Sequence, residues 1–547
     1  MKLPGRTPLG NHYCLALLVI ASTLGALYGQ FLSNPLVFDD YSYFGENIDD
    51  DLKSKGGWGL RGISIASFGW VIAALGGDLV WQRLFNLTLH IANAWLLFVF
   101  LVRLFEATLP QQDQSRVLDA AKPKPTALPW LAAFGALWFA LNPAAVYGVA
   151  YLAQRTIVMA TLFSLVTWLL FLEGLRRDQR RWLLASAVTY LLAVLSKEHA
   201  IMTPAISLAL LVLMRKFDRQ WLTKVWPTFL LYGLVGTFTF IQIKSGGIVG
   251  NAYEPNALTM LTELGIDPKQ AHALSVLTQS YLYFKYLIFW IVPNTNWMSV
   301  DMLERFARNF LVWPETLGLL AFAIYPALAV YLLWQRGRIG LMGLAMLGPW
   351  LMFATEISTI RIQEPFVIYR SYLWMPCLAI SLPFLFQKVP ARYAFILMMA
   401  VVVALVPLSW NRLVTFSDNF LLWDDALRLI PGKDKDSRIG RMYHNRGLTL
   451  LAKERYPEAL RDFDVALTYM PKHSYIYNHR ASVYLNTKRY WEALDDYDTA
   501  IWLNPNYYNP YLGRAATHEA LGNHAAARLD YARSCRLGVE EVCRLGY

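Results

Sequence analysis

The sequence predicts an all-α protein in which a polytopic bundle of membrane helices is followed by an α-solenoid of repeats. Three observations predict this architecture. The 547 residues are 56% hydrophobic and only 16% charged, whereas an average soluble domain is roughly a quarter charged. Apolar runs of about 20 residues, the length that a spanning helix needs, recur from Tyr13 to Trp410. After Trp410 these runs stop, and a motif with a period of 34 residues begins.

The first apolar run follows Lys2 and Arg6, an arrangement that secretory signal peptides share. Residues 15–31 form a long run without a convincing small-residue cleavage site. We therefore interpret this run as a retained first span, with a cleaved signal peptide as the alternative.

With the N-terminus inside, about eleven spans are predicted. They cover approximately residues 13–33, 83–105, 130–147, 157–175, 182–195, 200–214, 225–243, 315–334, 340–354, 372–386 and 393–409. Every second connection is then basic, through Arg103, Lys122, Lys124, Arg176, Arg177, Arg180, Arg181, Arg215, Lys216, Arg219, Lys224, Arg336, Arg338, Lys388 and Arg392. Lysine and arginine collect in cytoplasmic loops, so the formal net charge of +11 indicates membrane orientation, and nucleic acid is not an expected partner.

Residues 275–292 are also apolar enough to cross, but a crossing there would move Arg336 and Arg338 outside. We therefore interpret this segment as re-entrant or interfacial. The odd number of spans places the C-terminal tail outside the cytoplasm, together with the loops that carry Asp39, Arg61, Arg155, Lys197, Asn251 and Glu364. In that compartment Cys535 and Cys543 are expected to form a disulfide.

The tail contains an internal repeat. Residues 455–460, with the sequence RYPEAL, return at 489–494 as RYWEAL, and a divergent copy starts at Asn523. Upstream, Arg446 is echoed by Arg480 and Arg514. The 34-residue period resembles that of tetratricopeptide repeats, which stack into a superhelix. We predict a membrane domain over 1–412, a linker or capping half-repeat over 413–437, and repeats over 438–547 that bind a protein, with a passive spacer as the alternative.

Two adjacent carboxylates, Asp39 and Asp40, follow the first span directly. Carboxylates near hydrocarbon are costly and tend to be functional. A partly desolvated aspartate has a raised pKa and suits a general base that removes a proton from a hydroxyl. The alternative is a solvated cap beyond the membrane exit.

The segment from Asn34 to Asp40 resembles the first-loop acidic motif of the multispanning, lipid-linked-sugar-dependent glycosyltransferases of the GT-C class. Further segments are similar to the family of transmembrane and tetratricopeptide-repeat proteins, which act as protein O-mannosyltransferases in animals. These segments are 61–90, 142–155, 195–199 and 364–373, although in the last one Pro365 follows Glu364 and Tyr369 precedes Arg370. The resemblance covers nearly the whole chain in the same order, and the small number of repeats is typical of a bacterial version.

The resemblance implies an inverting, GT-C-like transferase at the bacterial inner membrane, with a periplasmic active site and repeats. Its donor would be a polyprenyl-phosphate-linked sugar and its acceptor a protein hydroxyl, as in protein O-glycosylation. Asp39 would be the base and Asp40 an orienting group. The donor phosphate would contact the cations of outer loops, because guanidinium groups bind phosphate well: Arg61, Arg155, Lys197, Arg361 and Arg370. Glu198, His90, Glu364 and Tyr372 are predicted to orient these groups.

Each of these residues also has a structural interpretation, as an ion pair, a snorkelling cation or a buried hydrogen-bonded histidine. No zinc-type spacing is present and no metal is expected, although Asp39 and Asp40 are the residues that would hold one. The sequence also lacks a nucleophile elbow, a phosphate loop and a dinucleotide fingerprint. Two other functions stay open, a non-catalytic envelope scaffold and a polymerase or ligase of lipid-linked oligosaccharides.

Overall fold

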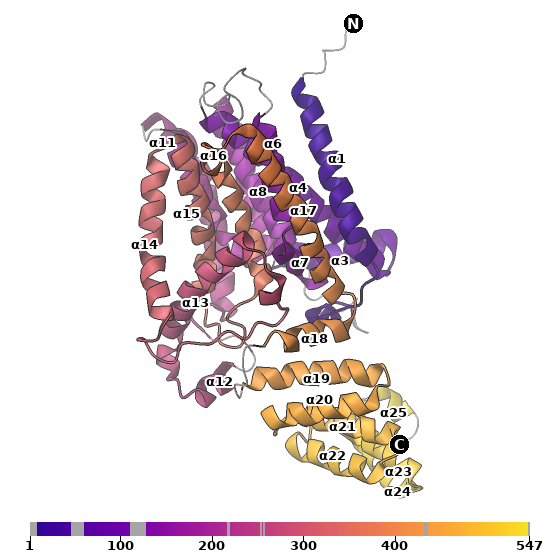
Figure 1. The fold of residues 1–547 in the computed structure, drawn as a ribbon. Coiled ribbons are helices and arrows are strands. Elements are labelled where there is room, and N and C mark those ends of the chain that lie inside the picture. Colours follow the sequence, from indigo (N-terminus) through magenta and orange to yellow (C-terminus); the bar gives the residue numbers. More distant parts are fainter. Residues whose placement is uncertain are drawn as a thin grey trace. The chain divides into compact units, whose positions relative to one another are not determined.

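The computed structural model describes residues 8–44, 59–109, 127–215, 219–251, 254, 257–430 and 436–544. These residues form helices and no strand, which confirms the all-α class. The chain divides into two compact units, unit 1 up to Ser417 and unit 2 from Asp418 (Figure 1). The basic residues Lys2, Arg6, Lys122, Lys124 and Lys216 lie outside the described residues.

Unit 1 is a bundle of α-helices joined by short 3₁₀ segments. The α-helices are α1 (Pro8–Tyr28), α3 (Gly62–Leu75), α4 (Leu79–Thr108), α6 (Ala127–Ala140), α7 (Pro143–Val149), α8 (Arg155–Arg177), α9 (Arg180–Ser196), α10 (Thr203–Met214), α11 (Arg219–Ser245), α12 (Ala257–Glu263), α13 (Pro268–Ile291), α14 (Glu315–Trp334), α15 (Gly337–Ile357), α16 (Leu382–Leu385) and α17 (Ala391–Thr415). The 3₁₀ segments are η1 (Gly29–Phe31), η2 (Phe38–Ser42), η3 (Leu152–Gln154), η4 (Glu198–Met202), η5 (Thr295–Trp297), η6 (Ile368–Leu373) and η7 (Met375–Ser381).

Seven helices in the described part of the chain are long and apolar enough to cross a membrane, and the bent pair α6 and α7 would make an eighth. The other predicted spans form shorter helices, because polar residues or turns interrupt the apolar runs. The predicted span at 182–195 is the 17-residue α9, that at 200–214 is split between η4 and α10, and that at 372–386 is split among η6, η7 and α16. The number of eleven crossings therefore stays a prediction. Helix α13 covers the ambiguous segment 275–292 and is not among the seven.

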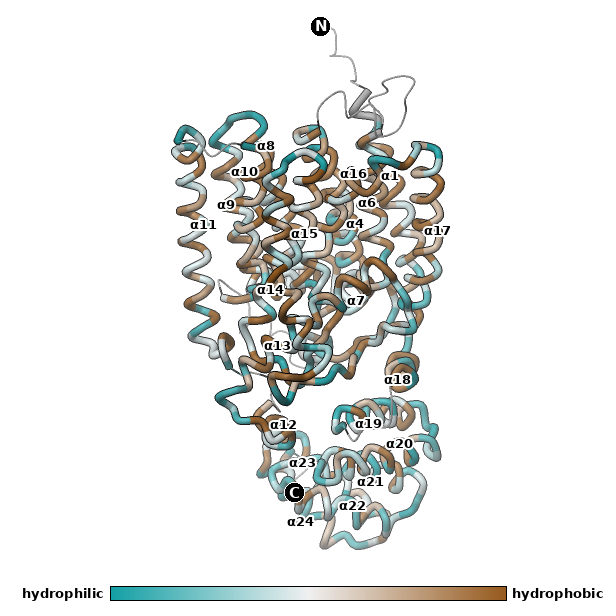
Figure 2. The backbone as a smooth tube through the Cα atoms, turned by 60° about the vertical axis from the view of Figure 1, so that its left-hand side comes forward, coloured by the Kyte–Doolittle hydropathy of each residue, from teal (hydrophilic) through white to brown (hydrophobic). Residues whose placement is uncertain are grey.

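Several basic residues that the sequence places on the inner side lie together at one end of the described part of unit 1. Arg176 contacts Glu106 and Glu173, and Arg103 shares both carboxylates. A guanidinium nitrogen of Arg336 donates to the Arg215 carbonyl at 2.7 Å. Hydrophilic loops at this end and hydrophobic residues along the helices are visible in Figure 2. The distribution is compatible with a membrane protein.

Unit 2 consists of stacked helix pairs. The short α18 (Asn419–Arg428) precedes α19 (Ser437–Ala452), α20 (Tyr456–Tyr469), α21 (Ser474–Asn486), α22 (Tyr490–Leu503), α23 (Tyr508–Ala520), α24 (His524–Arg536) and α25 (Glu540–Arg544). Small residues pack against aromatic residues of adjacent helices, both within a helix pair and between neighbouring pairs. A Cβ atom on Gly447 would lie 2.7 Å from the Phe463 ring, and one on Gly513 would lie 2.2 Å from the Tyr497 ring. These close approaches explain the small and aromatic positions of the repeat.

An arginine ladder, formed by Arg446, Arg480 and Arg514, ties the repeats of unit 2 together. Each guanidinium binds both oxygens of an aspartate 16 residues later, as Arg480 does with Asp496 at 2.7 and 2.8 Å. Each also binds a second aspartate earlier in the chain, and the second partner of Arg480 is Asp464 at 2.7 Å. The predicted disulfide joins Cys535 to Cys543 across α24 and α25.

Candidate functional site

The loop after α1 places its two carboxylates in different environments. Asp40 is buried and accepts hydrogen bonds from the backbone N–H groups of Val37, at 3.2 Å, and Ala153, at 2.7 Å. Burial raises the pKa of Asp40 to about 7, although these backbone hydrogen bonds oppose the shift. Asp39 is exposed, and its backbone N–H donates to the Tyr151 hydroxyl at 3.0 Å. Asp40 therefore fixes the loop, while Asp39 presents its carboxylate outward.

Arg83, which the sequence analysis did not single out, supports the same loop. Its guanidinium donates to the carbonyls of Asn34, at 3.1 Å, Pro35, at 2.5 Å, and Ala150, at 2.7 Å. Because the three carbonyls belong to two segments far apart in the sequence, Arg83 binds the acidic loop to the end of α7. This contact holds the backbone that carries Asp39.

Arg61 and Glu198 form a two-point ion pair between the start of α3 and η4. Arg61 Nε and Nη2 donate to the two carboxylate oxygens at 2.9 and 2.5 Å. The Glu198 charge raises the pKa of Arg61. Burial pushes the pKa of Glu198 upward, but the Arg61 charge and hydrogen bond outweigh it and hold that pKa well below its usual value. The pair therefore stays charged, and Arg61 keeps 38% of its side chain exposed.

Lys197 is buried next to this pair, and its hydrogen bonds go to other partners than the Glu198 carboxylate, which the sequence predicts to orient it. Its ammonium donates to Gln154 Oε1 at 3.3 Å and Thr156 Oγ1 at 3.2 Å, and it lies 5.7 Å from the centre of the Tyr369 ring. Burial, aided by the Arg61 charge, lowers the pKa of Lys197 to about 7. An anionic ligand beside Lys197 would therefore raise this pKa and favour the charged ammonium.

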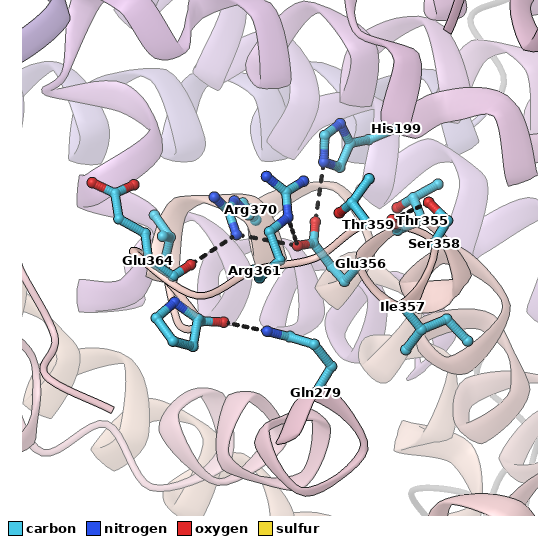
Figure 3. Close-up of polar contacts among 12 residues, drawn as sticks. His199, Gln279, Thr355, Glu356, Ile357, Ser358, Thr359, Arg361, Glu364 and Arg370 are labelled. Carbon is cyan, nitrogen blue, oxygen red and sulfur yellow. Dashed lines mark hydrogen bonds and ion pairs between the residues drawn. The ribbon is translucent and has the colours of Figure 1, made fainter. Parts of the chain in front are cut away.

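Glu356, at the end of α15, is the carboxylate that several elements share (Figure 3). It is fully buried, and its oxygens lie 3.0 Å from His199 Nε2, 3.2 Å from Arg370 Nη1 and 3.6 Å from Arg361 Nε. His199 also lies 3.4 Å from Glu198. A continuous network therefore runs from Arg61 through Glu198, His199 and Glu356 to Arg361 and Arg370. We call this network, together with Lys197, the cation cluster.

A cavity of about 220 Å³ opens beside the cation cluster. Its ionisable lining residues are Arg61, Glu198, His199 and Arg361, and its apolar lining includes Ile243 and Ile248. A larger groove of about 400 Å³ between α1, α4, α6 and α17 is lined almost entirely by apolar side chains. Of these two cavities, the smaller has the side chains for a charged ligand.

A chain of aromatic residues connects Asp39 to the cation cluster. The Tyr151 ring, whose hydroxyl accepts the Asp39 N–H, lies 6.0 Å from the Tyr369 ring, and Tyr369 in turn faces Lys197. Burial raises the pKa of Tyr369 to about 12, so its hydroxyl stays protonated. The structure thus gathers Asp39, Arg61, Lys197, Glu198, Arg361 and Arg370 from segments that are far apart in the sequence.

Arg155 is set apart from this group because its donors already bind protein. It is fully buried, and its guanidinium donates to Asn86 Oδ1 at 2.6 Å and to Gln82 Oε1 at 2.7 Å. The Phe68 ring lies 4.0 Å from its guanidinium carbon. These contacts favour a structural role in place of the predicted phosphate contact.

His90 and Tyr372 contact each other inside the bundle. Tyr372 hydroxyl and His90 Nδ1 are 2.6 Å apart, and His90 Nε2 lies 3.0 Å from the Ala140 carbonyl. Both side chains are fully buried, which favours the structural alternative for His90. Glu364 contributes its backbone carbonyl to Arg370 at 3.4 Å, whereas the sequence analysis assigned the orienting role to its side chain.

Four further residues of this site, Glu356, His199, Tyr151 and Tyr369, were not assigned a role from the sequence. Glu356 had a usable signal, because a carboxylate in an apolar helix is costly unless it is paired. His199 follows the assigned pair Lys197 and Glu198. The two tyrosines had no signal, since aromatic residues are common throughout the chain. Among the described residues no three His, Cys, Asp or Glu side chains are grouped as metal ligands would be.

Comparison with known proteins identifies the repeats. Residues 474–507 match the family model of the tetratricopeptide repeat, which confirms the repeat predicted there. The second TPR of Spaghetti (RPAP3) bound to HSP90 peptide SRMEEVD is 22% identical, with 18% of this chain and 94% of that chain covered and a TM-score of 0.18. The first TPR of the same protein, bound to the same peptide, is 25% identical, with coverages of 20% and 93% and a TM-score of 0.19. No curated protein matches the chain.

Proposed function

We propose that unit 1 is an integral membrane glycosyltransferase that moves a sugar from a polyprenyl-phosphate donor to a hydroxyl of an extracytoplasmic protein. The observation that carries the proposal is the chain of contacts that links the loop of the exposed carboxylate, Asp39, through Tyr151 and Tyr369 to the cation cluster. A base and an anion site at one place are the two components that this displacement requires.

The charge of the cation cluster supports an anionic ligand. Arg61, Lys197, Arg361 and Arg370 face two carboxylates, Glu198 and Glu356, within the cluster. Glu254 and Glu364 lie at its edge. Arg361 and Arg370 share the single carboxylate of Glu356, and the phosphate of the donor would supply further negative charge beside these guanidiniums.

The proposed reaction is a single displacement. Asp39 accepts the proton of the acceptor hydroxyl, whose oxygen forms a bond to the anomeric carbon of the sugar. The bond from that carbon to the phosphate oxygen breaks, and its electron pair leaves with the polyprenyl phosphate. The cation cluster stabilises the developing phosphate charge, which is commonly the largest catalytic contribution. One displacement inverts the anomeric carbon.

Unit 2 is proposed to bind a protein, either the acceptor or a partner, because tetratricopeptide repeats form interaction surfaces. This role is compatible with the transferase and equally with a non-catalytic scaffold. A polymerase or ligase of lipid-linked oligosaccharides would share the donor but not the acceptor.

Glycan masses on envelope proteins, compared between wild type and a deletion strain, test the proposal. Loss of a sugar mass from envelope proteins on deletion is the expected result. An unchanged set of glycoproteins with altered surface polysaccharide would replace the transferase with the polymerase or ligase. No change in either the glycoproteins or the surface polysaccharide would favour the non-catalytic scaffold.

A further inference from the structure

Three consecutive backbone N–H groups of the loop after α15 point at one carboxylate. The N–H groups of Ile362 and Gln363 donate to Glu254 Oε2 at 3.0 and 2.6 Å, and that of Glu364 lies 3.4 Å from Glu254 Oε1. Successive amides that converge in this way form a nest, a backbone concavity that binds anions. Glu254 belongs to a different segment, more than a hundred residues earlier.

The nest is held in place by α13 whether or not Glu254 occupies it. Ser275 donates to the Thr359 carbonyl at 3.1 Å and accepts from the Arg361 N–H at 3.0 Å. Gln279 donates to the Pro365 carbonyl at 2.7 Å, as Figure 3 shows. The side chains of Ile360 and Ile362 are buried in an apolar cluster with α12 and α13. The amides are therefore preorganised for an anion, which lowers the cost of binding one.

Backbone hydrogen bonds tie the described part of the segment before Glu254 to the loop after α15. Gly250 donates to the Ser358 carbonyl at 2.9 Å, and Asn251 accepts from Ile360 at 3.3 Å. Gly247 and Gly250 have φ angles of 69° and 73°, a region that glycine adopts at no steric cost. Ile248 and Val249 of this segment line the cavity beside the cation cluster. The nest and the cavity therefore share one wall.

Glu254 is a suboptimal ligand for this position. Burial raises its pKa, and the Glu364 charge adds to the shift, against the amides and Arg370. A carboxylate offers two oxygens and one negative charge. A phosphoryl group offers a third oxygen and more charge, and Arg370, which donates to the Glu364 carbonyl at 3.4 Å, lies beside the same loop.

We propose that the nest of Ile362, Gln363 and Glu364 is a binding site for a phosphoryl group, and that the Glu254 carboxylate occupies it as an intramolecular competitor which the phosphoryl group displaces. The proposal rests on the proposed function only in naming the donor lipid as one source of the phosphoryl group. Free phosphate is the other source. Binding to the nest requires no turnover.

Removing the competitor is expected to tighten phosphoryl binding. A site that its own competitor fills for about 90% of the time binds an external ligand about tenfold more weakly. Glu254→Gln in the purified full chain is therefore expected to bind inorganic phosphate and a short-chain prenyl phosphate about tenfold more tightly by calorimetry. Glu254→Ala is the second variant, because glutamine retains one acceptor oxygen. Glu263→Gln, on the exposed end of α12, removes a nearby charge and is expected to leave both affinities unchanged.

Tightening for both ligands supports a general phosphoryl site, and tightening for the prenyl phosphate alone assigns the nest to the lipid. Unchanged or weaker binding of both ligands in the two Glu254 variants, with thermal unfolding that shows a folded chain, would overturn the proposal. If Asp39→Asn keeps its transfer activity, the proposed transferase mechanism is wrong. The phosphoryl affinity of the Glu254 variants still tests the nest independently of that result.

Discussion

Arginines are stabilised in opposite ways in the two units. In the arginine ladder of unit 2, each guanidinium binds two aspartates and carboxylates outnumber cations. In the cation cluster of unit 1, one buried carboxylate, Glu356, serves Arg361, Arg370 and His199. Each guanidinium of the ladder is therefore satisfied by aspartates, whereas Arg361 and Arg370 of the cluster share one carboxylate. We propose that the ladder arginines hold the fold and that the cluster arginines are placed for an anionic ligand.

The largest expected effect comes from Glu356→Gln. Neutralising a fully buried carboxylate leaves two guanidiniums without their shared partner, and breaking such a pair costs about 3–5 kcal/mol. We expect a fall in the midpoint of thermal unfolding and a loss of sugar transfer of 100-fold or more. Added phosphate is expected to restore part of the stability, since it compensates the same cations. A variant with unchanged stability and activity would contradict the shared role of Glu356.

Arg480→Met is expected to have a smaller and purely structural effect. It leaves Asp496, whose side chain is 8% exposed, without its two-point partner, while Asp464 at 56% stays hydrated. We expect a loss of about 2–3 kcal/mol, measured as faster amide exchange of α21 and α22 in the full chain. Phosphate is not expected to rescue it. Rescue by phosphate would contradict the distinction between the ladder and the cluster.

Cys535→Ser removes the disulfide between α24 and α25. Opening a loop with a sequence separation of 8 is expected to cost about 2 kcal/mol of local stability, because short loops constrain the unfolded chain less. Amide exchange should rise in α24 and α25 and stay unchanged in α13 and α15. Cys377 is a buried free thiol of unit 1, so Cys377→Ser is not a matched control. The appropriate comparison is the wild-type chain with its disulfide reduced.

The smallest expected effect is a pH dependence of the repeats. His444 Nε2 and His479 Nδ1 are 2.9 Å apart, and burial together with neighbouring histidines lowers their pKa values to about 3 and about 4. The histidines of the unfolded chain bind protons near pH 6.5, whereas those of the folded chain bind them only at lower pH. The stability that the neutral histidines contribute is therefore full above pH 6.5 and is lost as pH falls toward 4. We expect each of the two histidines to contribute a loss of about 1 kcal/mol between pH 6.5 and 5.5, seen as faster exchange of α19 and α21. His479→Asn should flatten this dependence.

The arginines of the ladder could be recognised from the sequence, whereas only some residues of the cation cluster could. Arg446, Arg480 and Arg514 recur with the repeat because the same contact is built three times. Arg61 and Arg155 looked equivalent as lone cations. Their difference depends on partners 137 and 69 residues away, Glu198 and Asn86, and no local pattern indicates such pairs. Glu356 ends an apolar helix, and its partner His199 lies far earlier in the chain, so the local sequence did not indicate how the carboxylate is paired.

The central claim is that Asp39 is the base and the cation cluster holds the donor phosphate. The direct test measures donor binding and initial transfer rates for purified Asp39→Asn, with Asp78→Asn as control. Asp78 is exposed and caps α4 through the Val80 N–H at 2.9 Å, a contact that asparagine preserves. We predict that Asp39→Asn binds the donor normally and transfers sugar at least about 1,000-fold more slowly, within the range that loss of a positioned base allows. Transfer at the wild-type rate would contradict the account.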